Sequence, residues 1–195
     1  MAWSKAGSYT APAGGGVITS MPVNSVPDSK FYIYFSDYES NYDKQVIQFN
    51  GNTEDDYSWR FTNMGDGSST PAVDQAQCLG GVGGNGLYEF NVGYIANVSG
   101  YEKLIITHAG SNGGNGGNAP NKREIVSKWD IASGVITSMN FPPEQSGTTS
   151  TFDEGASVSV LGSDGVASVR VQDGAVFHET DTNKSYVLSS NVWSE

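Results

Sequence analysis

Short stretches of β-forming residues, separated by turns rich in glycine and asparagine, are the feature that most constrains this chain. The stretches lie at residues 17–21, 31–36, 44–49, 57–61, 86–95, 103–108, 123–129, 135–139 and 156–161. No segment shows a sustained helical period with caps, so we expect an all-β fold. About nine such strands favour a jelly-roll-like two-sheet β-sandwich. An immunoglobulin-like sandwich is the alternative, but its Cys–Trp–Cys pattern is absent.

Two sequence patterns refine this expectation. Residues 57–61 and 86–95 alternate apolar and polar residues. Successive side chains of a strand point to opposite faces, so we expect the apolar face of each stretch to be buried and the other face to be exposed to solvent.

The hexapeptide GVITSM occurs twice, at residues 16–21 and 134–139. We expect each copy to be a strand of the same sandwich, and interpret the repeat as convergence on strand-forming residues.

The chain divides into three parts. Residues 1–14 are dominated by Ala, Ser, Pro and Gly, which predicts a flexible N-terminal arm. Its Trp3 and Tyr9 either dock on a neighbouring molecule or fold back on the arm's own domain. Residues 15–163 form the predicted jelly-roll β-sandwich. Residues 164–195 read as a C-terminal β-hairpin or small meander that is too thin to be stable alone, so it must pack on the sandwich or on another subunit.

The overall charge argues against several classes of partner. The formal net charge is −11, with 10 Lys and Arg against 21 Asp and Glu. Binding nucleic acid relies on basic residues that neutralise phosphates, and no basic cluster is present, so we expect no nucleic-acid partner. No apolar run approaches the length of a membrane helix and the N-terminus lacks a secretory pattern, so we expect no membrane insertion and synthesis in a cytoplasm. The single cysteine, Cys78, is expected to be a small half-buried hydrophobe.

Motifs that carry chemistry are weak in this sequence. The string GVGGNG at residues 81–86 is followed by a strand pattern, whereas a dinucleotide site needs a helix there, so we interpret these residues as loop glycines. His108 and His178 lack a nucleophile-elbow motif, and we expect no catalytic residue and no enzyme activity. Carboxylates at 54–56, 153–154 and 179/181 lie in expected turns. We expect no cofactor and no metal, with a calcium site built from such loops as the alternative.

Aromatic residues supply the candidate binding sites. Tyrosine rings near loops suit stacking on sugar rings or packing at interfaces, although core or rim packing is the competing use. The candidate glycan contacts are Tyr38, Tyr42, Tyr57 and Tyr101. The candidate partner-binding residues, near the two ends of the chain, are Trp3, Tyr9, Tyr186 and Trp193.

Several segments resemble structural proteins of viruses. The run VIQFNGNT at 46–53 with YSWR at 57–60 is similar to a strand–turn–strand of a jelly-roll domain found in virion proteins of tailed phages and marine viruses. Residues 103–108, 123–129 and 154–162 also resemble that family, so the similarity covers roughly residues 17–163. Residues 177–193 resemble the "ETDTxKxY…W" hairpin at the ends of phage virion and tail proteins.

The resemblance implies a non-enzymatic virion protein on the surface of a phage particle, made in the host cytoplasm. A capsid decoration (cement) protein is the first expectation, and a tail or fibre-tip receptor-binding adhesin is the second. Other capsid or tail proteins would be its partners, with a homo-oligomer such as a trimer implied by the resemblance and a host-surface glycan as a further ligand. A carbohydrate-binding β-sandwich module is the rival class.

Overall fold

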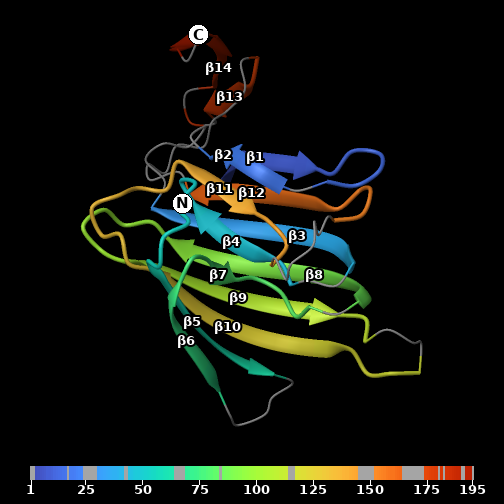
Figure 1. Ribbon diagram of the computed structural model, residues 1–195. Coiled ribbons are helices and arrows are strands. Elements are labelled where there is room, and N and C mark those ends of the chain that lie inside the picture. Colours follow the sequence, from blue (N-terminus) through green and yellow to red (C-terminus); the bar gives the residue numbers. More distant parts are fainter. Residues whose placement is uncertain are drawn as a thin grey trace.

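The computed structural model describes residues 3–16, 18–23, 30–41, 44–63, 69–83, 85–113, 117–144, 152–163, 174–179, 181, 183–189 and 192–194. Within these ranges the regular elements are all β-strands. The prediction of an all-β fold is therefore confirmed. Two stacked antiparallel sheets make the predicted sandwich (Figure 1).

The larger sheet has eight strands and spans the molecule. Every neighbouring pair in it is antiparallel. In pairing order, its strands are β1 (Trp3–Thr10), β12 (Ser157–Ser163), β3 (Phe31–Asn41), β8 (Asn85–Ala96), β9 (Lys103–Ser111), β10 (Asn121–Trp129), β5 (Tyr57–Asn63) and β6 (Thr70–Gln75).

A smaller sheet covers one face of the larger one. Its strands, in pairing order, are β2 (Ile18–Pro22), β11 (Ser138–Phe141), β4 (Val46–Phe49) and β7 (Cys78–Leu79). Aromatic side chains fill the space between the sheets: Tyr34 meets Phe141 with ring centroids 5.3 Å apart, and Phe49 meets Trp129 at 5.5 Å. Tilted aromatic pairs at such distances add to the free energy gained from burying their area.

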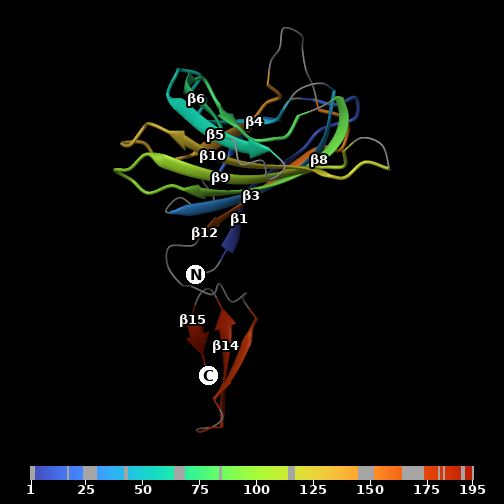
Figure 2. The same ribbon diagram turned by 90° about the horizontal axis from the view of Figure 1, so that it is seen from below.

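A third sheet lies at the C-terminus. It consists of β13 (Val176–Glu179), β14 (Lys184–Ser189) and β15 (Val192–Ser194), all antiparallel. Figures 1 and 2 both show it standing away from the two sheets of the sandwich. The last strand of the sandwich ends at Ser163, so the segment predicted as a C-terminal extension carries this separate small sheet.

The expectation of a flexible arm over residues 1–14 is wrong for most of its length. Trp3–Thr10 forms β1, an edge strand of the large sheet that pairs with β12 from Trp3 opposite Ser163 to Thr10 opposite Ser157. Small residues allow this edge strand to pack closely: Ala6 is buried, and a side chain at Gly7 would overlap the Pro22 carbonyl of β2. Low side-chain volume, which suggested disorder, here permits tight packing at the sandwich edge.

The two copies of the GVITSM repeat become neighbours in the small sheet. Strand β2 pairs antiparallel with β11, and Met21 lies opposite Met139. Both methionines are buried in the core. In the second copy the strand starts only at Ser138, because the preceding backbone binds a side chain instead: the Asn50 amide oxygen accepts from the Thr137 and Ser138 N–H groups.

Strand β8 lies with its faces opposite to our expectation. Glu89, Asn91 and Gly93 point into the sandwich, whereas Tyr88 and Phe90 are exposed. Glycine fits the inner position because Gly93 pairs with Tyr34 of β3, and a side chain there would overlap the Tyr34 ring. The inner face of β8 accommodates groups supplied by β3, so Tyr88, Phe90 and Tyr94 remain on the outside, whereas Ile95 is buried.

We expect Gly93→Ala to lower the free energy of unfolding by about 1–3 kcal/mol, because the added methyl group must displace a packed aromatic ring. Gly117→Ala is the matched control, since nothing lies within 4 Å of a side chain built there. The control should change stability by less than ~0.5 kcal/mol. Urea unfolding measures both. Equal effects of the two changes would contradict the packing of Tyr34 against Gly93.

Candidate interaction surface

The side of the large sheet that faces away from the small sheet carries a cluster of exposed apolar side chains. We call this side the outer face. Exposed aromatic and aliphatic residues on it come from five strands: Trp3, Phe31, Phe35, Tyr88, Phe90, Tyr94, Leu104, Ile106 and Val126. Phe90 alone keeps 51% of its surface accessible. Monomeric proteins rarely expose large contiguous apolar patches, and those that do use them as binding surfaces.

Strand register makes part of this cluster continuous. Ile33 pairs with Tyr94, Tyr94 with Ile106, and Ile106 with Val126. Because directly paired residues of antiparallel strands point to the same face, these four side chains form one apolar row across β3, β8, β9 and β10. The row lies near the start of β3 and near the end of β8.

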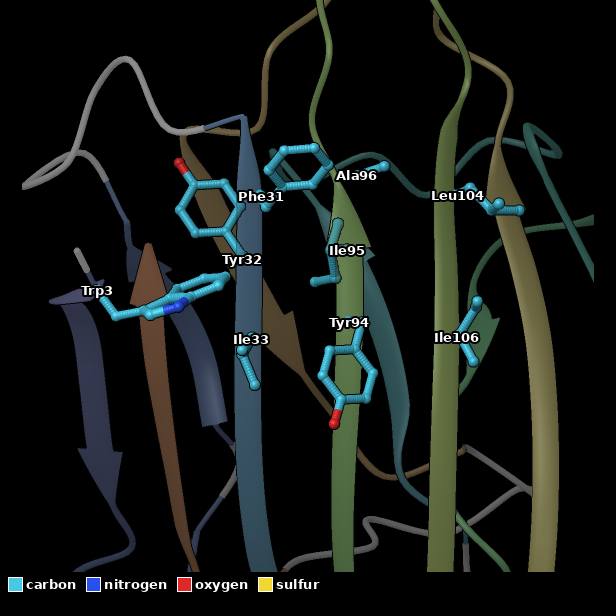
Figure 3. A pocket seen from close by; sticks show the side chains of 9 residues that line it. All are labelled: Trp3, Phe31, Tyr32, Ile33, Tyr94, Ile95, Ala96, Leu104 and Ile106. Carbon is cyan, nitrogen blue, oxygen red and sulfur yellow. The ribbon is translucent and has the colours of Figure 1, made fainter. Parts of the chain in front are cut away.

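A groove of about 360 Å³ lies over this row. Figure 3 shows Trp3, Ile33, Tyr94 and Ile106 projecting from four strands along it, with Phe31 and Leu104 at one end. All of these lining side chains are apolar or aromatic. The groove therefore suits the apolar side chains of a partner more than a charged ligand.

Charged groups on β9 and β10 lie beside the apolar row of the outer face. The Lys122 ammonium lies 2.9 Å from a Glu124 carboxylate oxygen, and His108 Nδ1 lies 3.9 Å from the same oxygen. The hydrogen bond from Lys122 lowers the pKa of Glu124. His108 also meets Tyr94 edge to face, with ring centroids 6.4 Å apart. An apolar centre with a charged rim is the usual anatomy of a protein interface.

The structure places the predicted partner-binding residues in different environments. Trp3 is exposed and lines the groove. Tyr9 packs half-buried against the core, so it serves its own domain. Tyr186 is half-buried in β14 with its ring 6.2 Å from Phe177. Trp193 pairs with Leu188 in β15, and its side chain lies outside the described part of the structure.

The predicted glycan contacts do not form a site together. Tyr101 is 70% exposed in the turn before β9, and Tyr42 lies outside the described residues. Tyr38 and Tyr57 are fully buried, which agrees with the competing use in core packing and not with glycan contact. The Tyr57 hydroxyl accepts from the Phe49 N–H at 2.9 Å, which ties β5 to β4, and burial raises the pKa of Tyr57. Their position beside turns in the sequence did not reveal these inward orientations.

Phe31, Phe35, Tyr88, Phe90 and Tyr94 were missed as exposed residues. We assigned their stretches as strands and expected the apolar side of the alternation to be buried. One signal could have identified the exposed face: the alternate residues of β8 include Gly93, which has no side chain to expose. A strand with aromatics on one side and a glycine on the other can pack its glycine side against large rings.

A buried carboxylate lies beneath the exposed cluster. Glu89 of β8 is fully buried and accepts hydrogen bonds from the Tyr38 hydroxyl at 2.6 Å, the Val82 N–H at 2.9 Å and the Gly83 N–H at 2.6 Å. A side chain at Gly81 would overlap the Tyr38 hydroxyl, so this position requires glycine. Within the glycine-rich string, Val82 and Gly83 thus bind a carboxylate of their own chain through their N–H groups.

Arg123 of β10 holds the other side of this loop. Its Nη1 donates to the Gly81 carbonyl at 3.0 Å, and its Nε donates to Asn63 Oδ1 at 2.7 Å. The guanidinium carbon lies 4.4 Å from the centre of the Phe61 ring. Burial raises the pKa of Glu89, although the hydrogen bonds and the positive charge of Arg123 act in the opposite direction. These contacts connect strands of the large sheet to the loop that follows β7 of the small sheet, so the cluster has a structural role.

The remaining reactive side chains do not converge. Cys78 is fully buried, more than the half-burial expected, and burial raises its pKa. His178 Nδ1 lies 3.0 Å from Ser185 Oγ on the exposed C-terminal sheet. Among the residues that the structure describes, no three His, Cys, Asp or Glu side chains are placed to hold a metal ion together. In the same ranges, no helix has the length and hydrophobicity to cross a membrane.

Comparison with known proteins gives no match: no family model, no curated protein and no solved structure matches this chain. The resemblance of residues 17–163 and 177–193 to virion proteins therefore stays a prediction. The functional argument depends on the surface and the buried groups of the chain itself.

The raised pKa of Glu89 predicts a specific pH dependence. Its pKa in the folded chain lies above the ordinary value of 4.5, so the folded state binds this proton more tightly than the unfolded state. The resulting stabilisation is complete at low pH and is lost as the pH rises through the raised pKa.

Glu89→Gln removes this titration. We therefore expect the free energy of unfolding of the wild-type chain, minus that of the variant, to fall as the pH rises above the ordinary pKa of 4.5. Urea unfolding at several pH values measures this difference. A difference that rises with pH would contradict the desolvation of Glu89 as the dominant effect.

Proposed function

We propose that this chain is a non-enzymatic structural protein of a virion surface, with capsid decoration as its most specific role. It would bind its neighbours through the outer face of the large sheet. The single observation that carries the proposal is the continuous apolar row Ile33–Tyr94–Ile106–Val126, in which Ile33 is half-buried and the other three side chains are exposed to solvent. The resemblance to virion jelly-roll proteins supports the same role.

The physical argument is that such a face costs free energy while it stays in water. Burial of apolar surface yields roughly 25 cal/mol per Å², so covering the exposed aromatics strongly favours association. The acidic balance of the chain, −11 overall, opposes non-specific aggregation through this face. A protein that must remain soluble until it meets a particle combines these two properties.

A glycan-binding role, in a tail adhesin or a carbohydrate-binding module, is the second candidate. One specific observation favours it. Tyr88 is exposed on the outer face, and its hydroxyl lies 3.5 Å from an Asp37 carboxylate oxygen. An aromatic ring beside a carboxylate can stack on a sugar ring and accept from its hydroxyl groups.

Particle binding tests the first proposal. Purified chain should cosediment saturably with phage particles that lack it, and Phe90→Asp should weaken this binding at least ~10-fold by placing a charge in the contact. Val135→Asp is the control, because Val135 is 43% exposed in the loop before β11 and lies outside the apolar row.

Two outcomes would count against the proposal. One is that wild-type chain does not bind particles. The other is that Val135→Asp weakens binding as much as Phe90→Asp, since the outer face would then have no special part in it. Binding to a glycan array that is lost in Tyr88→Phe or Phe90→Asp, without particle binding, would favour the second candidate.

A further inference from the structure

The C-terminal sheet carries a second exposed apolar surface. Val176 pairs with Val187, and Ser189, two residues further along the same strand, pairs with Val192. Register therefore puts Val176, Val187 and Val192 on one side of the sheet, one from each strand, and we call this side the valine face. Val176 and Val192 are 66% and 64% exposed. His178, Ser185 and Ser194 share this side and give it a polar border.

A three-stranded sheet of this size does not stabilise itself well. Its strands have 4, 6 and 3 residues. Leu188 is the one hydrophobic side chain that is buried among those described in these strands. Small sheets need an apolar face packed against another element to be independently stable. Figures 1 and 2 show this sheet away from its own sandwich, so that packing is not supplied there.

We propose that the valine face of one copy of the chain packs on the outer face of a second copy, over the groove lined by Tyr94 and Ile106. The inference rests on the proposed function, in which the outer face is an assembly contact. It adds that a second copy of the chain occupies this face. Aliphatic β-branched residues would then meet aromatic rings, a favourable pairing across packed β-surfaces.

The small sheet and the main lining of the groove each consist of three neighbouring strands. Neighbouring strands lie about 4.8 Å apart, so three strands span roughly 10 Å, and strands of four to six residues are roughly 13–20 Å long. The groove is lined mainly from three neighbouring strands, β3, β8 and β9, with Trp3 of β1 added to them. Sheets pack face to face at about 10 Å, with their side chains interdigitating.

Packing between copies uses different surfaces on the two molecules. Such a heterologous contact repeats from copy to copy and closes into a ring when the rotation between copies allows it. The ring would be a homo-oligomer of the kind that the virion resemblance implies.

Mixing two variants tests this contact. Val187→Asp places a charge on the valine face, and Ile106→Asp places one in the groove. Because each variant lacks one of the two complementary surfaces, we expect both to sediment as monomers at about 100 μM, where the wild-type chain is oligomeric. Mixed in equal amounts, they should form a heterodimer, because the intact valine face of one meets the intact groove of the other.

Two control variants separate this contact from a general effect of added charge. Val135→Asp should remain oligomeric. The double variant Val187→Asp/Ile106→Asp lacks both surfaces, so it should neither self-associate nor bind the wild-type chain. Far-UV circular dichroism and urea unfolding check that each variant is folded. Sedimentation velocity with one variant labelled identifies the heterodimer.

Three outcomes would overturn the inference: monomeric wild-type chain at about 100 μM, an oligomeric Val187→Asp variant, or no heterodimer in the mixture. Oligomers that survive Val187→Asp but not Ile106→Asp would indicate packing of outer face on outer face. A wild-type monomer that binds particles would contradict only this inference. Oligomers that fail to bind particles would contradict only the proposed function.

Discussion

The burial of the Glu89 carboxylate is the interaction on which the rest of the structure depends. A buried carboxylate is costly unless its oxygens accept hydrogen bonds, and here the Tyr38 hydroxyl and the Val82 and Gly83 amides supply them. These contacts join β8 to β3 and to the glycine loop, which Arg123 of β10 holds from its other side. Once Glu89 points inward, the two-residue period of the strand leaves Tyr88 and Phe90 on the outside.

The exposed aromatics of the outer face are therefore a consequence of which side chains the interior of the sandwich holds. The space between the sheets is filled by large rings from β3, β4 and β11, including Tyr34, Phe49 and Phe141. Opposite these rings β8 contributes Glu89, Asn91 and Gly93 together with Ile95 and no aromatic ring, because a second layer of aromatics would overfill the core. The aromatics of β8 are then available for contact with other molecules. The same physical arrangement stabilises the fold and creates the surface that we assign to assembly.

Sequence reasoning succeeded where a local pattern decides the structure. Turn residues and β-forming stretches located most of the strands of the two main sheets and the separate C-terminal β-segment. Sequence reasoning failed where contacts between distant segments decide whether a residue is buried or forms a strand. Trp3–Thr10 looked like a loose arm because its side chains are small, yet it is an edge strand. Tyr38 and Tyr57 looked accessible beside turns, yet their hydroxyls bind groups in the interior.

By itself the sequence determined the all-β class, the division into a sandwich and a small C-terminal sheet, and the acidic charge, because these follow from local propensity and composition. Only the tertiary structure decided which face of each strand is buried. A period of two is satisfied equally well by either orientation, and the choice depends on which groups the opposing strands present. The alignment of Ile33, Tyr94, Ile106 and Val126 into one row also required the strand register, which joins residues far apart in the chain.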